Sequence, residues 1–218
     1  MAANPRHRYY HEGMRRTLNF IIPPNKNVLF LGSYNGWILA NLSPKKGIGV
    51  DESKKNCKIS RKKYPKLTFV CAKYEDYKPT EKFDYIILAG TLGQTRDIAG
   101  VLRNLQKACH PSTRLVVYQH NYLWQWILSL AESWGLKRKE GIHNWLSLSD
   151  VSVYLEGAGF EATRIFERTL FPIFLFGLGP LVNGIAAVFP FFDFLKLDQY
   201  VLARPLPELF PQNAMPKS

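Results

Sequence analysis

The sequence predicts an α/β protein with a parallel β-sheet that carries helices on both faces. Short apolar runs typical of buried strands alternate with helical patterns over the first half of the chain. The first run, 28–31, breaks at two glycines, Gly32 and Gly36, and the second run, 48–50, ends on Asp51. A strand, a tight turn into a helix and a second strand form the repeating unit of a parallel sheet.

Helical patterns precede and separate these strands. Tyr10, Met14 and Leu18 repeat at helical spacing, so we expect a leading helix over 9–20 that stops at two following prolines. Ser53 is placed to cap the helix that follows the second strand. Another helix is expected after Asp97, where apolar residues share one helical face.

Length and composition indicate one globular domain. We place it over 1–205 of the 218 residues, followed by a flexible tail over 206–218. Hydrophobic residues make up 46% of the chain and charged residues 21%, which argues against disorder. Three widely spaced cysteines suggest free thiols and no metal cluster. The polar N-terminus lacks the apolar core of a signal peptide, so we expect a cytoplasmic location.

The chain is strongly basic, with a formal net charge of +12. Many of its cations fall in one run: Lys54, Lys55, Lys58, Arg61, Lys62, Lys63 and Lys66. This run fits a solvated helix face, and it equally fits attraction to a polyanion, either nucleic acid or an anionic membrane. Charge alone does not separate these readings.

The glycine turn and the acid that follows it predict a site for a nucleoside-containing cofactor. Glycines at a strand-to-helix turn let the backbone approach a ligand closely. Asp51, about 20 residues after the first glycine, is placed to accept hydrogen bonds from a ribose diol. A dinucleotide site would need glycine where this chain has Tyr34, so a pyrophosphate cradle is poorly supported.

These motifs resemble the first two motifs of the class I S-adenosylmethionine-dependent methyltransferases. Later segments resemble the rest of that family in order, over residues 9–205 in all: 69–76, 83–90, 102–118 and 150–161. The resemblance implies a Rossmann-like, doubly wound, mostly parallel seven-stranded sheet, with an apolar insertion between the last two strands. It also implies that S-adenosylmethionine is the cofactor.

The resemblance assigns roles to particular residues. The cofactor would contact the backbone of Gly32, Ser33 and Gly36, and Asp51 would bind the ribose. Tyr74 and Glu75 would lie near the adenine, and Ala89 and Gly90 would follow the fourth strand. For a hydroxyl acceptor, His120 after the fifth strand is the candidate general base, and His143 is its rival.

Three positions depart from the family pattern. Phe30 replaces an acid that usually orients the glycine turn, Tyr34 replaces the middle glycine, and Lys73 stands where an adenine-contacting acid often lies. If Tyr34 fills the cofactor cleft, the alternative is a non-catalytic module of the same fold that acts as a membrane-associated binding protein.

The segment 169–198 is unusually apolar. No charged side chain occurs from Thr169 to Phe192, yet prolines and glycines interrupt the stretch too often for a spanning helix. It could form a lid over a hydrophobic substrate, lie in the interfacial layer of a bilayer, or make a homodimer interface or extra core. Its aromatic residues do not alternate with Lys and Arg, which makes nucleic acid an unfavoured partner.

Together these features lead to one hypothesis for function. The chain would transfer a methyl group from S-adenosylmethionine to a hydrophobic or lipid-linked small-molecule acceptor, at oxygen. The hypothesis places the enzyme in the cytoplasm and allows peripheral contact with an anionic membrane surface.

Overall fold

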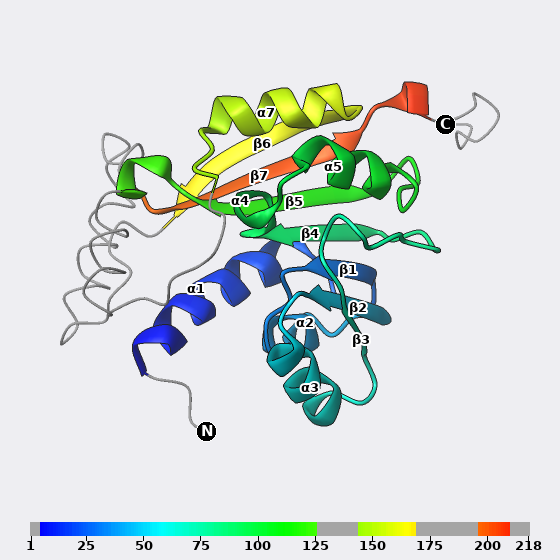
Figure 1. Ribbon diagram of the computed structural model, residues 1–218, viewed down its shortest axis with the longest axis vertical. Coiled ribbons are helices and arrows are strands. Elements are labelled where there is room, and N and C mark those ends of the chain that lie inside the picture. The colour runs from blue at the N-terminus through cyan, green and yellow to red at the C-terminus, as the bar shows by residue number, and fades with distance from the viewer. Residues whose placement is uncertain (1–4, 126–143, 169–195, 210–218) are drawn as a thin grey trace.

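A seven-stranded sheet forms the centre of the molecule (Figure 1). The computed structural model describes residues 5–125, 144–168 and 196–209. The strands are β1 (Asn27–Leu31), β2 (Lys46–Asp51), β3 (Thr68–Cys71), β4 (Tyr85–Ala89), β5 (Arg114–His120), β6 (Phe160–Arg168) and β7 (Asp198–Pro205). Their order is β3-β2-β1-β4-β5-β7-β6. Strands β1 to β5 pair in parallel and β7 runs antiparallel to both neighbours, which confirms the predicted Rossmann-like fold.

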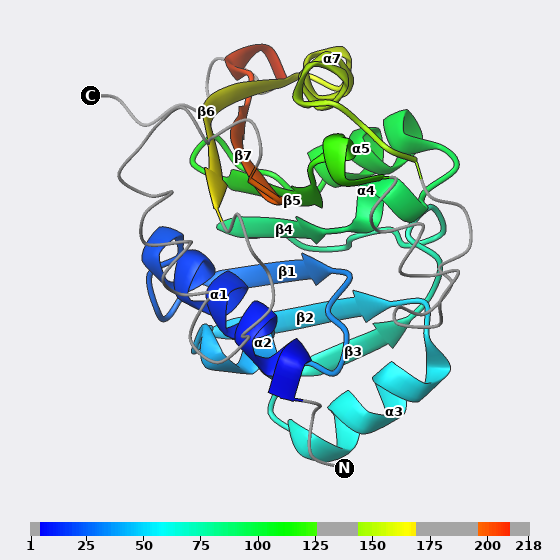
Figure 2. The ribbon, with the colours of Figure 1, turned by 90° about the vertical axis from the view of Figure 1, so that its left-hand side faces the viewer.

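Helices cover both faces of the sheet (Figure 2). The helical elements are α1 (Pro5–Ile21), α2 (Trp37–Asn41), α3 (Lys54–Lys63), α4 (Thr91–Gln94), α5 (Ile98–Gln106), α7 (Leu148–Gly157) and the short 3-10 turns η1 (Tyr122–Trp124) and η3 (Pro207–Leu209). Residues of α1 and α2 share one hydrophobic core with one face of the sheet, and residues of α4, α5 and α7 share a second core with the other face. Helix α3 packs along the edge strand β3.

The central strands are apolar because both of their faces are buried. In β1, Val28 and Phe30 face the core under α1, whereas Leu29 and Leu31 face the core under α5. Phe30 is fully buried, so a hydrophobic side chain occupies the position where the family usually has an acid. This position contributes packing, and the glycine turn must be held by other residues.

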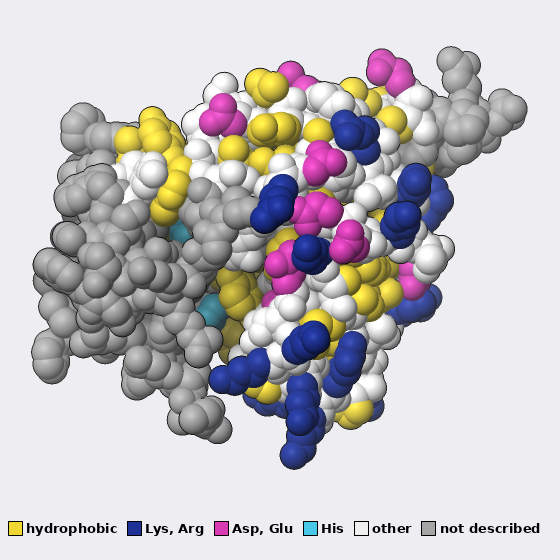
Figure 3. Space-filling view, in the orientation of Figure 1, with side chains coloured by type: hydrophobic (Ala, Val, Ile, Leu, Met, Phe, Trp, Pro, Cys, Tyr) yellow, Lys and Arg dark blue, Asp and Glu magenta, His cyan; other side chains and the backbone are white. Residues whose placement is uncertain are grey.

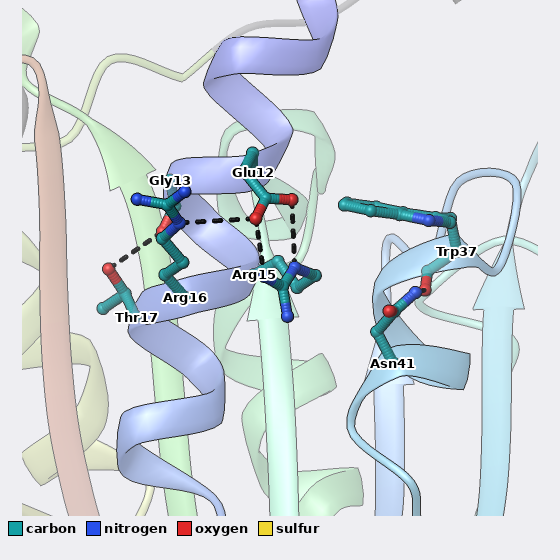
Figure 4. A network of polar contacts seen from close by, with 7 residues as sticks. All are labelled: Glu12, Gly13, Arg15, Arg16, Thr17, Trp37 and Asn41. Atoms are coloured by element: carbon teal, nitrogen blue, oxygen red, sulfur yellow. Dashed lines mark hydrogen bonds and ion pairs between the residues drawn. The ribbon is translucent and has the colours of Figure 1, made fainter. Parts of the chain in front are cut away.

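Helix α1 is held against α2 by a polar network (Figure 4). The Arg15 guanidinium lies 6.0 Å from the centroid of the Trp37 ring and donates to Glu12 at 2.5 and 3.0 Å. Asn41 in turn donates through Nδ2 to the Trp37 carbonyl at 2.8 Å. Because α2 directly follows the glycine turn, these contacts place α1 beside the predicted cofactor site.

Several element boundaries differ from the expected ones. Helix α1 begins at Pro5, since proline is well suited to a first helical position. Strand β5 continues past Tyr118 to His120, because β7 pairs with it as far as Asp198. Helix α7 ends at Gly157, and Gly159 with φ +70° turns the chain into β6.

Parts of three earlier expectations fall outside the described residues. These are His143, the apolar segment from 169 to 195 between β6 and β7, and residues 210–218 of the predicted tail. At the start of that tail, the Leu206 amide donates to the Gly159 carbonyl at 2.8 Å. Across the described parts of the chain, no helix is long and apolar enough to cross a bilayer.

Candidate cofactor and acceptor site

The predicted site residues converge on the carboxyl edge of the sheet. Strand order reverses direction at β1, because β2 and β3 lie on one side of it and β4 and β5 on the other. Ligands of open α/β sheets bind at such a switch point, beyond the carboxyl ends of the strands. Gly32, Asp51, Gly90 and His120 lie at or directly after those ends of β1, β2, β4 and β5.

The glycine turn after β1 requires glycine for two physical reasons. Gly32 and Gly36 have φ of +79° and +74°, a region that residues with a Cβ rarely adopt. A Cβ on Gly32 would also lie 2.4 Å from the Ala89 carbonyl oxygen, and one on Gly36 would lie 2.6 Å from the Phe69 ring. The turn therefore keeps its backbone against β4 and β3 only with these residues.

The backbone amides of this turn donate hydrogen bonds within the protein. Gly32 and Ser33 donate to the Val50 carbonyl at 2.9 and 3.1 Å, and Gly36 donates to the Ser33 carbonyl at 2.9 Å. The buried Ser33 hydroxyl points to β2, 2.6 Å from where a Cβ on Gly49 would lie. These three residues can therefore contact a cofactor by close approach of the chain, but their N–H groups already have acceptors.

Asp51 organises the turn and the start of α3. Its Oδ2 accepts from the Tyr34 amide at 2.8 Å, and its Oδ1 accepts from the Ser53 amide at 2.9 Å and from Asn56 Nδ2 at 3.0 Å. A carboxylate has about four acceptor positions, so the geometry leaves room for one further donor on Oδ2. Asp51 thus replaces the orienting acid that is absent at Phe30.

Asp51 is only 6% exposed, and this burial raises the pKa of its carboxyl group, with the three hydrogen bonds opposing the shift. For an acid whose folded pKa lies above the unfolded value, the stability contribution is fully present below the unfolded pKa. It is lost as pH rises through the folded pKa. Burial of the ionised carboxyl group therefore opposes folding, as is common for residues at functional sites.

Tyr34 lies across this edge of the sheet. Its φ of +49° is unusual for a non-glycine residue, and its carbonyl accepts from Ser60 Oγ of α3 at 3.1 Å. Its hydroxyl is 3.9 Å from where a Cβ on Gly90 would lie, and its ring makes an edge contact with His11 at 5.8 Å. The side chain is on the surface, 39% exposed, and is not part of either hydrophobic core.

The two residues expected near an adenine have contacts of their own. Tyr74 is buried in the core beneath α4 and α5, and desolvation followed by the nearby Asp51 charge raises the pKa of its hydroxyl. Glu75 accepts from the Arg96 amide at 2.8 Å through Oε1. Glu52 directly follows β2, and its Oε1 lies 3.4 Å from the Tyr74 amide.

Gly90 directly follows β4 in a left-handed conformation with φ +66°, and its amide donates to the Tyr118 carbonyl at 2.9 Å. Ala89 before it is buried. The Thr91 hydroxyl donates to the Leu31 carbonyl at 3.1 Å and so joins β4 to the glycine turn. Asn144 anchors the chain beside α4 by donating to the Gly93 carbonyl at 2.7 Å.

A polar cluster lies one strand further along, where β5 meets β7. His120 Nδ1 is 3.8 Å from Asp198 Oδ1, and the Tyr118 hydroxyl donates to the same oxygen at 2.7 Å. Asp198 and Tyr118 are buried, whereas the His120 side chain is 25% exposed. A partly exposed imidazole beside a buried carboxylate is an arrangement suited to proton transfer.

Several residues of this site were not expected from the sequence. Asp198, Ser60 and Asn56 reach it through strand pairing and the packing of α3, which give no local pattern. His11 reaches it because α1 crosses the edge of the sheet near Tyr34. Among the residues that the structure describes, no group of three or more His, Cys, Asp or Glu is arranged to hold a metal ion.

The sheet, with its parallel centre and its antiparallel last strand, defines a class I methyltransferase fold. The sequence matches the family described as "Methyltransferase domain" over residues 6–165, which is well over half of the chain. The chain belongs to this family, and it is a methyltransferase with S-adenosylmethionine as cofactor. No curated protein matched the sequence.

Solved structures with the same fold include several methyltransferases. A SAM-dependent methyltransferase from Thermotoga maritima aligns with a TM-score of 0.68 at 15% identity, covering 91% of this chain and 90% of that one. One from Mesorhizobium loti aligns at 0.66 and 15% identity, covering 87% and 96%. The magnesium protoporphyrin IX methyltransferase of Synechocystis, with bound SAH, aligns at 0.61 and 14% identity, covering 94% and 89%. At these identities the likeness establishes the fold.

Proposed function

We propose that the enzyme transfers a methyl group to an oxygen atom of a hydrophobic or lipid-linked small molecule at an anionic membrane surface. The observation that carries the choice of oxygen is the position of His120, one strand from Gly90 and beside the buried Asp198. The uncharged stretch from Thr169 to Phe192 and the net charge of +12 support the lipid part. The expected cytoplasmic location and a homodimer belong to the same proposal.

The residues present fit the cofactor once Tyr34 rotates. When bound, S-adenosylmethionine supplies a methyl group on a positively charged sulfonium. Gly32 and Gly90 would let it lie against the backbone, and the remaining acceptor position of Asp51 would take one ribose hydroxyl. Glu52 would accept a hydrogen bond from the second ribose hydroxyl, and Tyr74 and Glu75 would border the adenine. The chain then has mainly to align the two reactants and exclude water.

His120 would act as general base for the acceptor hydroxyl. With Nδ1 turned towards Asp198, Nε2 is the nitrogen that would take the proton. Asp198 would hold the imidazole in this orientation and stabilise the imidazolium that forms. Tyr118, which donates to Asp198, would fix the carboxylate in turn.

Replacing Tyr34 by glycine should strengthen S-adenosylmethionine binding by about five- to tenfold, roughly 1–1.4 kcal/mol. The change removes the ring beside Gly90 and relieves a left-handed residue. Calorimetric titration would measure the dissociation constant, with Tyr34→Phe as the variant that keeps the ring. Weaker binding by Tyr34→Gly would mean that the ring packs on the cofactor. Absence of binding by both the variant and the native chain would favour a non-catalytic module.

The acceptor class can be tested with methyl-labelled S-adenosylmethionine and total membrane lipid as the acceptor pool. We expect label to enter the organic phase, and excess S-adenosylhomocysteine to suppress it. Mild alkali then separates labelled methyl esters from ethers and from N-methyl products. Label that stays in the aqueous phase, with cofactor binding intact, would refute a hydrophobic acceptor.

A further inference from the structure

We propose that the outer face of α3, with the cavity between α3 and β3, binds the phosphate headgroups of an anionic membrane. We call this surface the α3 face; it consists of Lys54, Lys55, Lys58, Ile59, Arg61, Lys62 and Lys63. It lies apart from the methyl-transfer site, and it rests on the proposed function for the identity of its lipid partner.

The α3 face concentrates positive charge around a hollow. A cavity of about 730 Å³ is lined by Lys54, Cys57, Lys58, Arg61, Lys62 and Cys71. The helix contains no acidic residue, and its lysines and Arg61 are exposed. In the space-filling view, Lys and Arg side chains gather over the α3 end of the molecule (Figure 3).

Part of this positive charge is arranged at a cost to the helix, although Arg61, Lys62 and Lys63 stand in the last turn, where the helix dipole favours cations. Lys54, Lys58 and Lys62 follow one another at four-residue spacing, where like charges destabilise a helix. Lys54 and Lys55 also stand in the first turn, where the helix dipole disfavours cations. Within the part of the chain that the structure describes, none of the lysines of α3 forms an ion pair. An anionic surface would relieve both costs.

The inner side of α3 fixes this face in position. From this side Ser60 donates to the Tyr34 carbonyl and Asn56 donates to Asp51. Arg61, a member of the α3 face, is itself fixed to β3, because its Nε donates to the Phe69 carbonyl at 2.9 Å. The charged face is therefore attached directly to the turn that would hold the cofactor. Docking through α3 would bring that edge of the sheet close to acceptors in the lipid layer.

A membrane explains the composition of this face better than a nucleic acid does. Ile59 is 41% exposed in the middle of the cations, as expected for a side chain that enters the interfacial layer. Single-stranded nucleic acids are usually bound by exposed aromatic rings between the cations. Tyr64, the aromatic residue that directly follows α3 in the chain, has its ring 5.3 Å from the Lys63 ammonium.

The test is co-sedimentation of the full chain with two kinds of vesicle. One contains phosphatidylcholine alone, and the other contains about 30% phosphatidylglycerol, an anionic lipid that attracts basic surfaces. We expect binding only to the anionic vesicles. The double variant Lys58→Gln/Lys62→Gln should bind about thirtyfold more weakly, because each lysine near such a surface contributes about 1 kcal/mol to binding. The matched control is Arg103→Gln/Lys107→Gln, which removes two exposed cations from the region of α5.

Equal losses in the two double variants would show that only net charge matters and would overturn the assignment to α3. No binding of the native chain to anionic vesicles would overturn it as well, and so would displacement from the vesicles by single-stranded RNA at physiological salt. Calorimetry with S-adenosylmethionine on the same samples separates the two proposals. Intact cofactor binding without vesicle binding refutes the α3 face and the membrane location but leaves methyl transfer to a hydrophobic acceptor standing, whereas vesicle binding without lipid methylation refutes the proposed acceptor alone.

Discussion

Asp51→Ala is expected to weaken S-adenosylmethionine binding by about 1.5–3 kcal/mol, or roughly ten- to 150-fold, as for loss of a charge-assisted hydrogen bond. It should also lower the free energy of unfolding by about 2–4 kcal/mol. Three donors lose their acceptor, and relief of the buried charge offsets only part of that cost. Calorimetry would measure the first effect and urea unfolding the second.

Asp76→Ala is the matched control for this experiment. It also removes an aspartate side chain, but from an exposed position in the loop after β3. The free energies of cofactor binding and of unfolding should each change by no more than about 0.5 kcal/mol. If folded Asp51→Ala kept native affinity for the cofactor, Asp51 would be a structural residue only. The second hydroxyl acceptor, Glu52, would then be the residue to test.

The sequence predicted the sheet well because buried strands and helices leave regular apolar patterns. The runs 28–31 and 48–50 are apolar on both faces, and the structure places them as adjacent parallel strands under two hydrophobic cores. The glycines of the turn were also predictable, since their conformation and close approach to β4 and β3 admit no side chain. Such features are determined by local residues or by simple periodicity.

The partners of the site residues could not be predicted in the same way. Asp198 lies opposite His120 only through the register of β5 and β7, which are 78 positions apart at this pair. The substitute for the missing acid at Phe30 comes from Asp51 and Ser60, which hold the amide and carbonyl of Tyr34. These contacts depend on how whole helices and strands pack against one another, which a local sequence pattern does not predict.

His120→Ala is expected to lower the rate of methyl transfer to an oxygen acceptor by about 10²–10⁴-fold, the usual contribution of a general base. The dissociation constant for S-adenosylmethionine should stay within about twofold of the native value, because His120 ends β5, two strands away from β1 and its glycine turn. Asp198→Asn should give a smaller loss of about tenfold, since the imidazole would lose the neighbouring charge that stabilises its protonated form. Single-turnover transfer of labelled methyl at saturating cofactor would measure these rates.

The control for this prediction is His110→Ala. His110 precedes the amino end of the same strand, where its Nε2 lies 3.3 Å from Asp84 Oδ1 and its Nδ1 lies 2.9 Å from the Ser112 hydroxyl. Its loss should leave the transfer rate unchanged at a modest cost in stability. Full activity of His120→Ala would eliminate this histidine as the base, and His143 would become the residue to replace. Loss of cofactor binding in His120→Ala would instead show that the cluster at β5 and β7 supports the cofactor site and does not act on the acceptor.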